Sequence, residues 1–589
     1  FTDGERDVTS MVAWAVADDR LASIAAGTAT SAGIGGRTQV TARASGQTAT
    51  AELTIVLEVT VVDPNAPPDA PSLFPADTSG DTVADLRIVY PSDGTMFPRN
   101  LDRATHQWET SAGGLDLYEL RFDSDLAHVR FYTTERAYAL DPTSWRWLAE
   151  THAGDEVQFT VRGLTRASPA TIRRSQTITE LFSASEVLGA LYYWSTGAAG
   201  VMRAHISAPI AEKFYTDPNS GDDTCVACHT VSRDGRRLAV GYGGERLREV
   251  TIPERTQLIP APPATQGPSY GWGTFNPGAT RLLYAAQGAL TLLDADTGQS
   301  LGAVALPASR FATHPDWSPD GRHVAIAYGQ RRPGNKDAQG TSIARLPVNA
   351  DGTFGTPEVI VASTDDDQDT LFFPSYSPDS QWIVFVRARG KSKDNPTSRL
   401  MIVRAEPGST PIELTILNQR VRDADGVIDI GNSMPTWAPS TTRDIFWIAF
   451  ASLRDYGWIL RGEARDQLWG AAIDPSRAAA GADPSYAAFW MPFQSSDEGN
   501  HRAFWALASE DVCPSTVEIC DGIDNDCDAI VDEMCCTVAP EICGNGMDED
   551  CDGVADEGCG CSGAEICSNG LDDDCDMLID DADEDCFIF

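Results

Sequence analysis

Apolar and polar residues alternate in short runs along most of the chain, which is the period-two pattern of β-strands. The stretches "TQVTARASGQTATAELTI" (38–55) and "VQFTVRGL" (157–164) show it, and Gly, Pro, Asn and Asp separate such runs. Runs with helical spacing are few, and no segment approaches the roughly 18 consecutive apolar residues that a membrane helix needs. The pattern predicts an all-β chain of several domains without a membrane span.

Five segments in the middle of the chain repeat one pattern, a polar turn followed by a strongly apolar run. They are "HTVSRDGRRLAVGYG" (229–243), "GTFNPGATRLLYAAQ" (273–287), "PDWSPDGRHVAIAYG" (315–329), "PSYSPDSQWIVFVRA" (374–388) and "PTWAPSTTRDIFWIAFAS" (435–452). Their spacing, about 40 to 60 residues, is typical of β-propeller blades. "GALYYWSTG" (189–197) and "VMRAHIS" (201–207) before them, and "GNHRAFWALA" (499–508) after them, would close the ring. Residues 171–508 therefore predict a propeller of about six blades.

The repeats resemble the PD40 signature of TolB-like propellers. The closest copy is "PDWSPDG", with Trp317, Ser318, Pro319, Asp320 and Gly321. The resemblance implies the propeller fold and leaves the function open, because unrelated functions occur on this fold.

Two smaller β-domains are predicted before the propeller. Residues 1–60 resemble the group 2 bacterial Ig-like domains through Trp14, the Asp18–Asp19 turn, Gly27 and a closing alternating strand. The family's first strand would precede residue 1, so either processing or the chosen start removed it, or another chain supplies a strand to the open edge. Residues 61–84 are a Pro-rich linker that we expect to act as a semi-rigid spacer.

Residues 85–170 predict a second sandwich, of the Ig or fibronectin type. Its three histidines, His106, His128 and His152, are isolated in the sequence. An isolated histidine is usually a surface or structural residue, so no site is predicted in this domain.

The sharpest chemical signal is the sequence Cys225-x-x-Cys228-His229. This spacing attaches a haem through two thioether bonds, with His229 as the proximal iron ligand. The alternatives for a CxxC pair are a disulfide or a zinc site, but zinc needs further Cys or His ligands that no nearby pair supplies. We therefore expect one covalent haem c, and the resemblance to cytochromes c covers this motif only.

The motif runs directly into the first propeller repeat, so it can be aligned with the other blades. Setting Ser232 against the corresponding turn residues of the other repeats places Cys228 level with four residues: Trp272, His314, Phe373 and Met434. This position precedes the innermost strand of each blade, so we expect these residues to ring one mouth of the central channel, with the haem near the axis.

The same ring supplies candidates for the distal iron ligand. Met434 is the first candidate, because it lies in the polar turn "GNSMPTWAP" and thioether ligation would raise the reduction potential. His314 is the second candidate, and His501 and His205 are weaker alternatives. The sequence shows no second cofactor motif and no acid–base pair beside the site, and "TDDDQDT" (364–370) is interpreted as a solvated loop. Whether the protein is an enzyme stays uncertain; electron transfer is favoured, and peroxidase-like chemistry is a minor alternative.

The last 81 residues differ from the rest in charge and in cysteine content. The net charge is −42, and residues 511–589 contain 25 Asp or Glu but no Lys or Arg. Twelve of the 14 cysteines lie between Cys513 and Cys586. So many cysteines without nearby histidine predict disulfides and an oxidising compartment. So acidic a tail argues against nucleic acid as a ligand, because the tail would repel the phosphate backbone.

Residues 509–589 contain three copies of one pattern, "EICDGIDNDCDAIVDE", "EICGNGMDEDCDGVADE" and "EICSNGLDDDCDMLIDD". These copies resemble the metal-binding repeats of MopE-like bacterial surface proteins. Each has aspartates at positions 1, 3, 5 and 9 of an EF-hand-like loop, which predicts up to three calcium sites. The predicted ligands are Asp524, Asp526, Asp528 and Asp532; Asp548, Asp550, Asp552 and Asp556; and Asp572, Asp574, Asp576 and Asp580. A merely solvated acidic tail is the alternative, and copper is a poorer guess because the loops lack His.

These patterns together predict an all-β exported protein: Ig-like sandwiches, a roughly six-bladed propeller with one haem, and a disulfide-rich, loop-rich C-terminal tail. The leading function is extracellular or cell-surface electron transfer with another redox protein as partner, although a periplasmic location also fits. The alternative is a calcium-stabilised adhesion or filament protein with an accessory haem, which would self-assemble through its Ig-like modules.

Overall fold

The computed structural model describes residues 9, 12–78, 81–83, 85–111, 113–216, 226–242, 246–259, 271–334, 337–392, 394–419, 422–423, 426–427, 430–439, 444–463 and 465–507. Contacts divide the chain after Ala508 into two units, and all described residues belong to the first. The predicted C-terminal tail, with its disulfides and aspartate loops, lies outside the described residues.

The first domain is built from two small antiparallel sheets. One consists of β1 (Ala13–Val16), β4 (Gly36–Ala44) and β5 (Gln47–Ile55), and the other of β2 (Ala22–Ala25) and β3 (Thr28–Ser31). Ser45 and Gly46 connect β4 to β5 with φ of 49° and 78°, and Ala44 pairs with Gln47. Two successive positive φ values give a two-residue turn whose twist matches that of the flanking strands, which explains Gly at the second position.

The second domain packs a large sheet against a three-stranded one. The large sheet contains β6 (Leu57–Val62), β12 (Ala127–Thr133), β11 (Leu117–Ser124), β14 (Glu156–Thr165), β15 (Ser168–Arg174), β7 (Thr82–Val83), β16 (Ile178–Phe182) and β9 (Thr95–Phe97). The smaller sheet contains β13 (Ala137–Ala139), β10 (Thr105–Thr110) and β8 (Leu86–Tyr90). Their core includes the fully buried rings of Trp108, Phe122, Phe131 and Phe159.

Strand pairing between distant segments gives this domain boundaries that differ from those predicted from the sequence. β6 runs parallel to β12, with Leu57 paired to Ala127, so the domain starts before the predicted linker. β16 pairs with β14, so the sandwich continues to Phe182 and the propeller begins at β17. Two short helices complete the domain: α1 (Ala70–Leu73) and α2 (Pro142–Thr151), the latter capped by the Asp141 carboxylate, which accepts from the Ser144 amide.

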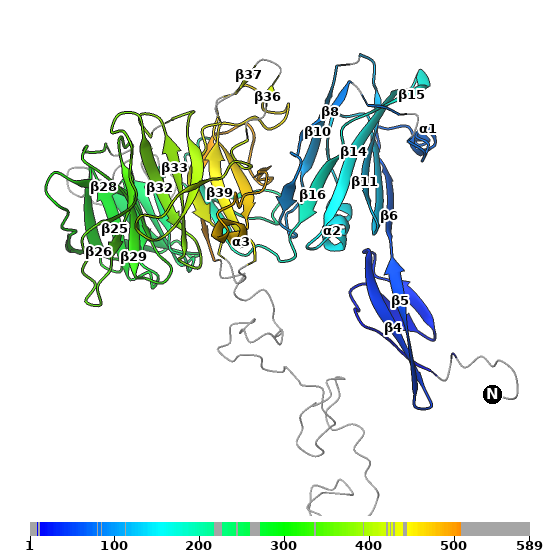
Figure 1. The fold of residues 1–589 in the computed structure, drawn as a ribbon, viewed down its shortest axis with the longest axis horizontal. Helices are drawn as coiled ribbons and strands as arrows, with labels where there is room; N and C mark the ends of the chain where they lie inside the picture. The colour runs from blue at the N-terminus through cyan, green and yellow to red at the C-terminus, as the bar shows by residue number, and fades with distance from the viewer. Residues whose placement is uncertain are drawn as a thin grey trace, which may run out of the picture. The chain divides into compact units, whose positions relative to one another are not determined.

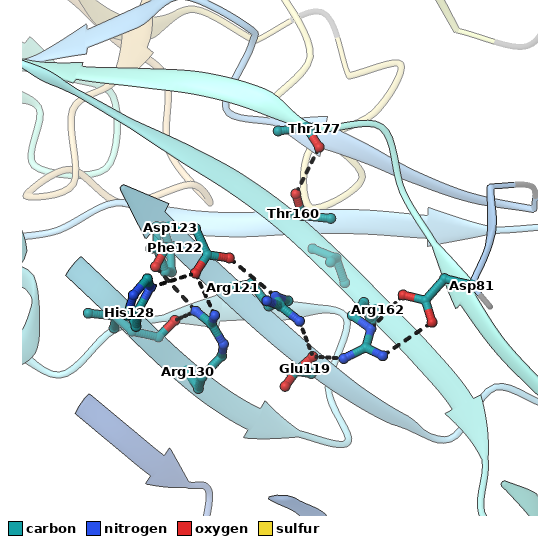
Figure 2. A network of polar contacts seen from close by, with 12 residues as sticks. Asp81, Glu119, Arg121, Phe122, Asp123, His128, Arg130, Thr160, Arg162 and Thr177 are labelled. Atoms are coloured by element: carbon teal, nitrogen blue, oxygen red, sulfur yellow. Dashed lines mark hydrogen bonds and ion pairs between the residues drawn. The ribbon is translucent and has the colours of Figure 1, made fainter. Parts of the chain in front are cut away.

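The predicted linker lies against the large sheet, where a buried arginine fastens it. Arg162 of β14 is fully buried and forms ion pairs of 2.7 Å with Asp81 and with Glu119 of β11. It also donates to the carbonyl oxygen of Pro75 at 3.0 Å. Figure 2 shows this arginine between the two carboxylates, next to ion pairs along β11 that connect Glu119 through Arg121 to Asp123. Pro75 and Asp81 of the predicted linker are therefore held by the sheet.

The propeller consists of six four-stranded antiparallel sheets among the described residues (Figure 1). In chain order the sheets are β17 (Ala190–Ser195), β18 (Gly200–His205), β19 (Glu212–Tyr215) and β42 (Asn500–Ala506); β20 (Val226–Val231), β21 (Arg237–Tyr242), β22 (Arg246–Thr251) and β23 (Gln257–Ile259); β24 (Trp272–Phe275), β25 (Arg281–Ala286), β26 (Ala289–Asp294) and β27 (Ser300–Ala303); β28 (Phe311–Trp317), β29 (His323–Gly329), β30 (Ser342–Pro347) and β31 (Glu358–Val361); β32 (Thr370–Tyr376), β33 (Trp382–Ala388), β34 (Arg399–Arg404) and β35 (Ile412–Glu413); and β38 (Ser433–Trp437), β39 (Phe446–Ser452), β40 (Gln467–Ile473) and β41 (Phe489–Trp490). A hairpin, β36 (Arg422–Asp423) and β37 (Gly426–Val427), and helix α3 (Pro475–Ala479) are additions.

The ring closes as the sequence predicts. The inner strands β20, β24, β28, β32, β38 and β42 each contact the next, and β42 also contacts β20. The C-terminal strand β42 pairs with β17 from the start of the propeller, so the last sheet combines both ends of this part of the chain. The prediction of about six blades, closed by "GNHRAFWALA", is confirmed.

The repeated signature forms the same turn in three of the blades. The hydroxyl of Ser318 donates to Asp320 at 2.6 Å and accepts from the His323 amide at 3.0 Å. Ser232 and Ser377 make the same pair of contacts within their own turns. The three serines that were aligned from the sequence therefore occupy equivalent positions in the structure.

We predict that replacing Arg162 with alanine lowers the free energy of unfolding of the second domain by about 3–5 kcal/mol, because Asp81 would keep a buried, unpaired charge. Glu119 would keep only its longer pair with Arg121 (3.9 Å) and the hydrogen bond from Tyr132. Hydrogen exchange of peptides from β11 and β14, in the full-length protein, measures this. The control is Arg166→Ala, which breaks an exposed pair with Asp116 (3.2 Å) and should cost less than about 1 kcal/mol. Equal protection from hydrogen exchange in both variants would show that Arg162 does not hold the predicted linker against the sheet.

Candidate functional site

One residue of each of four inner strands projects into the central channel through the same backbone feature. His314, Phe373, Met434 and Arg502 have φ of 50°, 47°, 52° and 53°. Each lies where the pairing register of its inner strand shifts by a β-bulge. A bulge re-aims a side chain, and all four residues line the same cavity.

Aromatic rings fill most of this channel. The ring of His314 lies 4.1 Å from that of Phe373 and 4.8 Å from that of Trp272, measured between centroids. The guanidinium of Arg502 stacks 4.0 Å above the Trp272 ring. The remaining cavity is about 70 Å³, which holds a few water molecules.

The structure describes part of the CxxCH motif. Cys225 lies outside the described residues, and Cys228 is described only as part of the β20 backbone. The register of β20 shifts between Ala227 and Thr230, so Cys228 and His229 occupy the bulge. That is the position of His314 and Pro315 in β28. Cys228 is therefore level with the channel residues, as the alignment predicts.

His229 is held inside the propeller with one ring nitrogen unpartnered. Its side chain is fully buried, and Nε2 donates to the carbonyl oxygen of Tyr192 at 3.0 Å. A carbonyl oxygen only accepts, so Nε2 carries the proton and Nδ1 keeps its lone pair. Among the described residues, Nδ1 has no hydrogen-bond partner. Burial, followed by the charge of Arg502, lowers the pKa of His229 to about 3, so the imidazole is neutral near pH 7.

Arg502 connects His229 to the channel. Its Nε–H donates to the carbonyl oxygen of His229 at 2.9 Å, and the ring of Phe504, also in the lining, lies 5.4 Å from the His229 ring. Arg502 is not among the site residues predicted from the sequence. The signal was present in "GNHRAFWALA", because placing this strand in register with β20 sets Arg502 level with Cys228.

The chemistry of His229 fits an axial haem ligand. The size of the channel cavity limits where the haem could lie. A neutral, buried imidazole with one nitrogen on a backbone carbonyl and the other unpartnered is the arrangement of a metal-ligating histidine. A cavity of about 70 Å³ is far below the roughly 300–1,000 Å³ of pockets for drug-sized ligands. A haem attached at Cys228 would therefore have to lie at the channel mouth.

Of the other candidate iron ligands, two line the channel cavity and two do not. Met434 is half-buried in the channel lining and packs against a cluster that includes Trp272. His314 is 4% exposed, and neither of its ring nitrogens has a hydrogen-bond partner among the described residues. His501 packs on Trp194 at 4.8 Å, and His205 lies 3.4 Å from an Arg203 nitrogen; neither lines the channel cavity.

The three histidines of the second domain have protein partners. His106 pairs with Glu180 at 3.0 Å, His128 with Asp123 at 3.2 Å, and His152 with the hydroxyl of Ser124 at 2.8 Å. Within the described ranges, no three His, Cys, Asp or Glu side chains converge as a metal site. The twelve predicted aspartate ligands lie outside those ranges.

Comparison with known proteins gives one family match and several similar structures. The family described as "Putative metal-binding motif" (Cu-binding MopE) matches residues 508–533, 538–557 and 562–581. Those three segments contain all twelve predicted aspartate ligands. A search of the curated proteins found no match. In the described part of the chain, no helix is long and apolar enough to cross a membrane.

Two TolB structures and one enzyme are among the similar solved structures. TolB from Acinetobacter baumannii is 11% identical, with a TM-score of 0.35 over 60% of this chain and 80% of that one. The putative TolB from Agrobacterium tumefaciens is 15% identical, with a TM-score of 0.30 over 55% and 100%. Hydrazine synthase from Kuenenia stuttgartiensis is 13% identical, with a TM-score of 0.29 over 45% and 76%.

The blade that carries the motif also contains an ion pair with a buried carboxylate. Glu249 of β22 is fully buried and accepts from Arg237 at 3.0 Å through one oxygen, whereas the other oxygen has no partner among the described residues. Burial is the largest influence and raises the pKa of Glu249 from 4.5 to about 7. A raised carboxyl pKa favours the protonated folded form, so its contribution to stability is complete below about pH 4.5 and is lost as the pH rises through 7.

We predict that Glu249→Gln removes this pH dependence. Between pH 5 and pH 8 the wild-type protein should lose about 2–3 kcal/mol more stability than the variant, measured by thermal unfolding at each pH. Glu358→Gln, which alters the exposed pair with Arg345 (2.8 Å) in another blade, should behave as the wild type does. Parallel profiles for the wild type and Glu249→Gln would contradict the assignment.

Proposed function

We propose that this protein is an exported monohaem c-type cytochrome on a β-propeller, acting in electron transfer at or outside the cell surface. The supporting observation is His229: a neutral imidazole, buried in the inner-strand bulge directly after Cys228, with Nε2 on a carbonyl and Nδ1 unpartnered. The bound haem would supply one-electron chemistry through its iron.

The protein's own residues would fix the geometry of that iron ligand. The carbonyl oxygen of Tyr192 orients the imidazole and sets its tautomer. Arg502 holds the backbone of His229 from the neighbouring inner strand. Because these contacts come from two strands of the closing sheet, the ligand is positioned by the closed ring.

Met434 is proposed as the second axial ligand and His314 as its alternative. Both lie in the channel lining level with Cys228. Met434 is half-buried, and a thioether ligand would raise the reduction potential. Peroxidase-like chemistry, which needs an open sixth position, is the minor alternative.

A partner and a compartment follow from the same proposal. One haem in a chain of 589 residues cannot relay electrons over long distances alone, so another redox protein must dock near the channel mouth. Bacteria attach haem c after export, and the cysteine-rich tail also suits an oxidising compartment. We therefore place the protein at the cell surface, outside the cell or in the periplasm.

The first test of the proposal is covalent attachment. Exported from a bacterium that matures cytochromes c, the full-length protein should keep haem on a denaturing gel, and the variant Cys225→Ala/Cys228→Ala should lose it, because no thioether can form. Ser232→Ala, in the turn after the motif, is a control that should keep its haem. A wild-type protein without covalent haem in this host would refute the cytochrome assignment.

The same preparations test the axial ligands. His229→Ala should keep the covalent haem but change its visible spectrum. Loss of the low-spin spectrum in Met434→Leu would support Met434, and an unchanged spectrum there would shift the assignment to His314.

A second candidate function rests on the tail. The metal-binding motif matches three segments, and each contains aspartates at positions 1, 3, 5 and 9 of a calcium loop. In this alternative the protein is a calcium-stabilised adhesion or filament component, and the haem is accessory. Dense like charge explains the need for a cation, because the carboxylates repel one another without one.

We predict saturable calcium binding by the full-length protein, with a Kd of about 10⁻⁴ to 10⁻³ M as in extracellular modules. Asp524→Asn, Asp548→Asn and Asp572→Asn should each remove one site in calorimetry, because each changes the first position of one loop. Asp585→Asn, which lies in the acidic tail after the third twelve-residue loop, should bind as the wild type does. Binding of copper but not calcium would contradict the calcium assignment.

A further inference from the structure

Arg454 is buried and has no carboxylate partner among the described residues. It is 7% exposed, and its Nε and Nη2 groups donate to neutral oxygens of Ser452, Leu417 and Asn432 at 2.9 to 3.0 Å. Nη1 has no partner within the described ranges. Burial, the single influence on the pKa of Arg454, lowers it from 12.5 to about 9, so the group stays charged near pH 7 and no close carboxylate offsets the charge. A buried charge is normally paired, so this guanidinium is suited to an anionic partner.

A second buried donor without an acceptor lies next to this guanidinium. The guanidinium of Arg454 stacks 5.1 Å from the ring of Trp469, which is 2% exposed. Nε1 of Trp469 has no hydrogen-bond partner among the described residues, and an indole N–H can only donate. Both residues line one cavity of about 280 Å³. Buried polar atoms are normally satisfied, so the two donors point to a ligand with acceptor atoms.

The other charged side chains of the lining have partners of their own. Arg87 pairs with Glu109 at 3.2 Å. Asp93 and Asp455 each accept from a backbone amide at 2.8 Å, and Asp455 has a further interaction. Neither carboxylate influences the pKa of Arg454. The charge of Arg454 is therefore left for a ligand.

The neutral polar groups of the lining fit the same ligand. The side-chain amide of Gln176 pairs with backbone groups of β8, and the hydroxyl of Thr177 pairs with another hydroxyl. Ser92 and Gln419 also line the cavity. Hydroxyl and amide groups can donate as well as accept, so both suit a ligand that only accepts.

Apolar side chains form most of the rest of the lining, and they come from two domains. The hydroxyl of Tyr90 accepts from the Trp490 amide at 2.9 Å, and its ring lies 4.9 Å from that of Tyr456, so the second domain contacts the propeller here. Ligand pockets are common at such junctions, and those for drug-sized ligands measure roughly 300–1,000 Å³. The cavity therefore suits a slightly smaller ligand with an apolar body. Its apolar lining consists of Ile88, Val89, Tyr90, Pro91, Ile178, Ile416, Trp469, Ala487 and Ala488.

We propose that this cavity binds a small monocarboxylate with an apolar body, an aliphatic or aromatic acid. The carboxylate pairs with Nη1 of Arg454, because a guanidinium matches the planar oxygen pair of a carboxylate and one positive charge suits a monovalent anion. The apolar body packs on Trp469 and Ile416. The cavity shares no lining residue with the central channel, so the site is separate from the proposed iron ligands and does not rest on the proposed function.

The experiment measures the binding of benzoate and hexanoate to the full-length protein by calorimetry. We expect saturable binding of both acids, and binding of benzamide, which has the same ring but no charge, that is weaker by at least about tenfold. Arg454→Gln should weaken benzoate binding by at least about tenfold. Ile416→Asp, which places a carboxylate at a half-buried position of the lining, should weaken it similarly because like charges repel.

The matched control is Arg404→Gln, which removes a guanidinium that stacks 4.9 Å from the Trp382 ring in another blade, outside the cavity lining. It should bind benzoate as the wild type does. Circular dichroism of each variant tests whether it is folded, and the Ile416→Asp result keeps the test decisive if Arg454→Gln does not fold.

A wild-type protein that binds neither acid overturns the proposal, as does equal affinity for benzoate and benzamide. Folded Arg454→Gln and Ile416→Asp variants that bind benzoate as tightly as the wild type overturn it too. Displacement of benzoate by an equal concentration of chloride would show a site for inorganic anions and overturn the requirement for an apolar body. The haem-free Cys225→Ala/Cys228→Ala variant should bind benzoate as the wild type does, so failure of the cytochrome assignment leaves this test intact.

Discussion

The bulge in the inner strand of the blades is the constraint on which the channel depends. A regular strand alternates its side chains between its two faces, whereas the bulge places one residue at positive φ and turns it toward the axis. Left-handed backbone at a non-glycine residue costs of order 1 kcal/mol, and His314, Phe373, Met434 and Arg502 all adopt it. Packing in the closed ring of inner strands offsets that cost, so the channel chemistry requires an intact propeller.

The same constraint explains how the CxxCH sequence can lie at the start of a strand. Cys228 and His229 occupy the bulge of β20, where the regular alternation of the strand is interrupted. His229 is enclosed against Tyr192 and Phe504 of the closing sheet.

Much of the propeller could be predicted from sequence because its repeat is local. Ser232, Ser318 and Ser377 each form a turn with a nearby aspartate, so the alignment of one turn fixes the register of the strand before it. Domain boundaries could not be predicted in this way. Alternation identifies β6 and β16 as strands, but it does not show that they pair with β12 and β14.

The site was predictable in part, for a related reason. The motif and the ring position of His314 and Met434 follow from spacing. The roles of Arg502 and Arg162 depend on partners more than 80 residues away, His229 and Asp81 among them, and no local pattern encodes them. Unpartnered nitrogens, such as those of His314, are likewise a property of the folded lining.

The most direct measurement of the central claim is the mass of the proteolytic peptide that contains Cys225 and Cys228, from protein exported in a host that attaches haem c. The account predicts a single peptide heavier by the mass of one haem, bound through both cysteines. A peptide with two free thiols, or one lighter by two hydrogens because the cysteines form a disulfide, would contradict it.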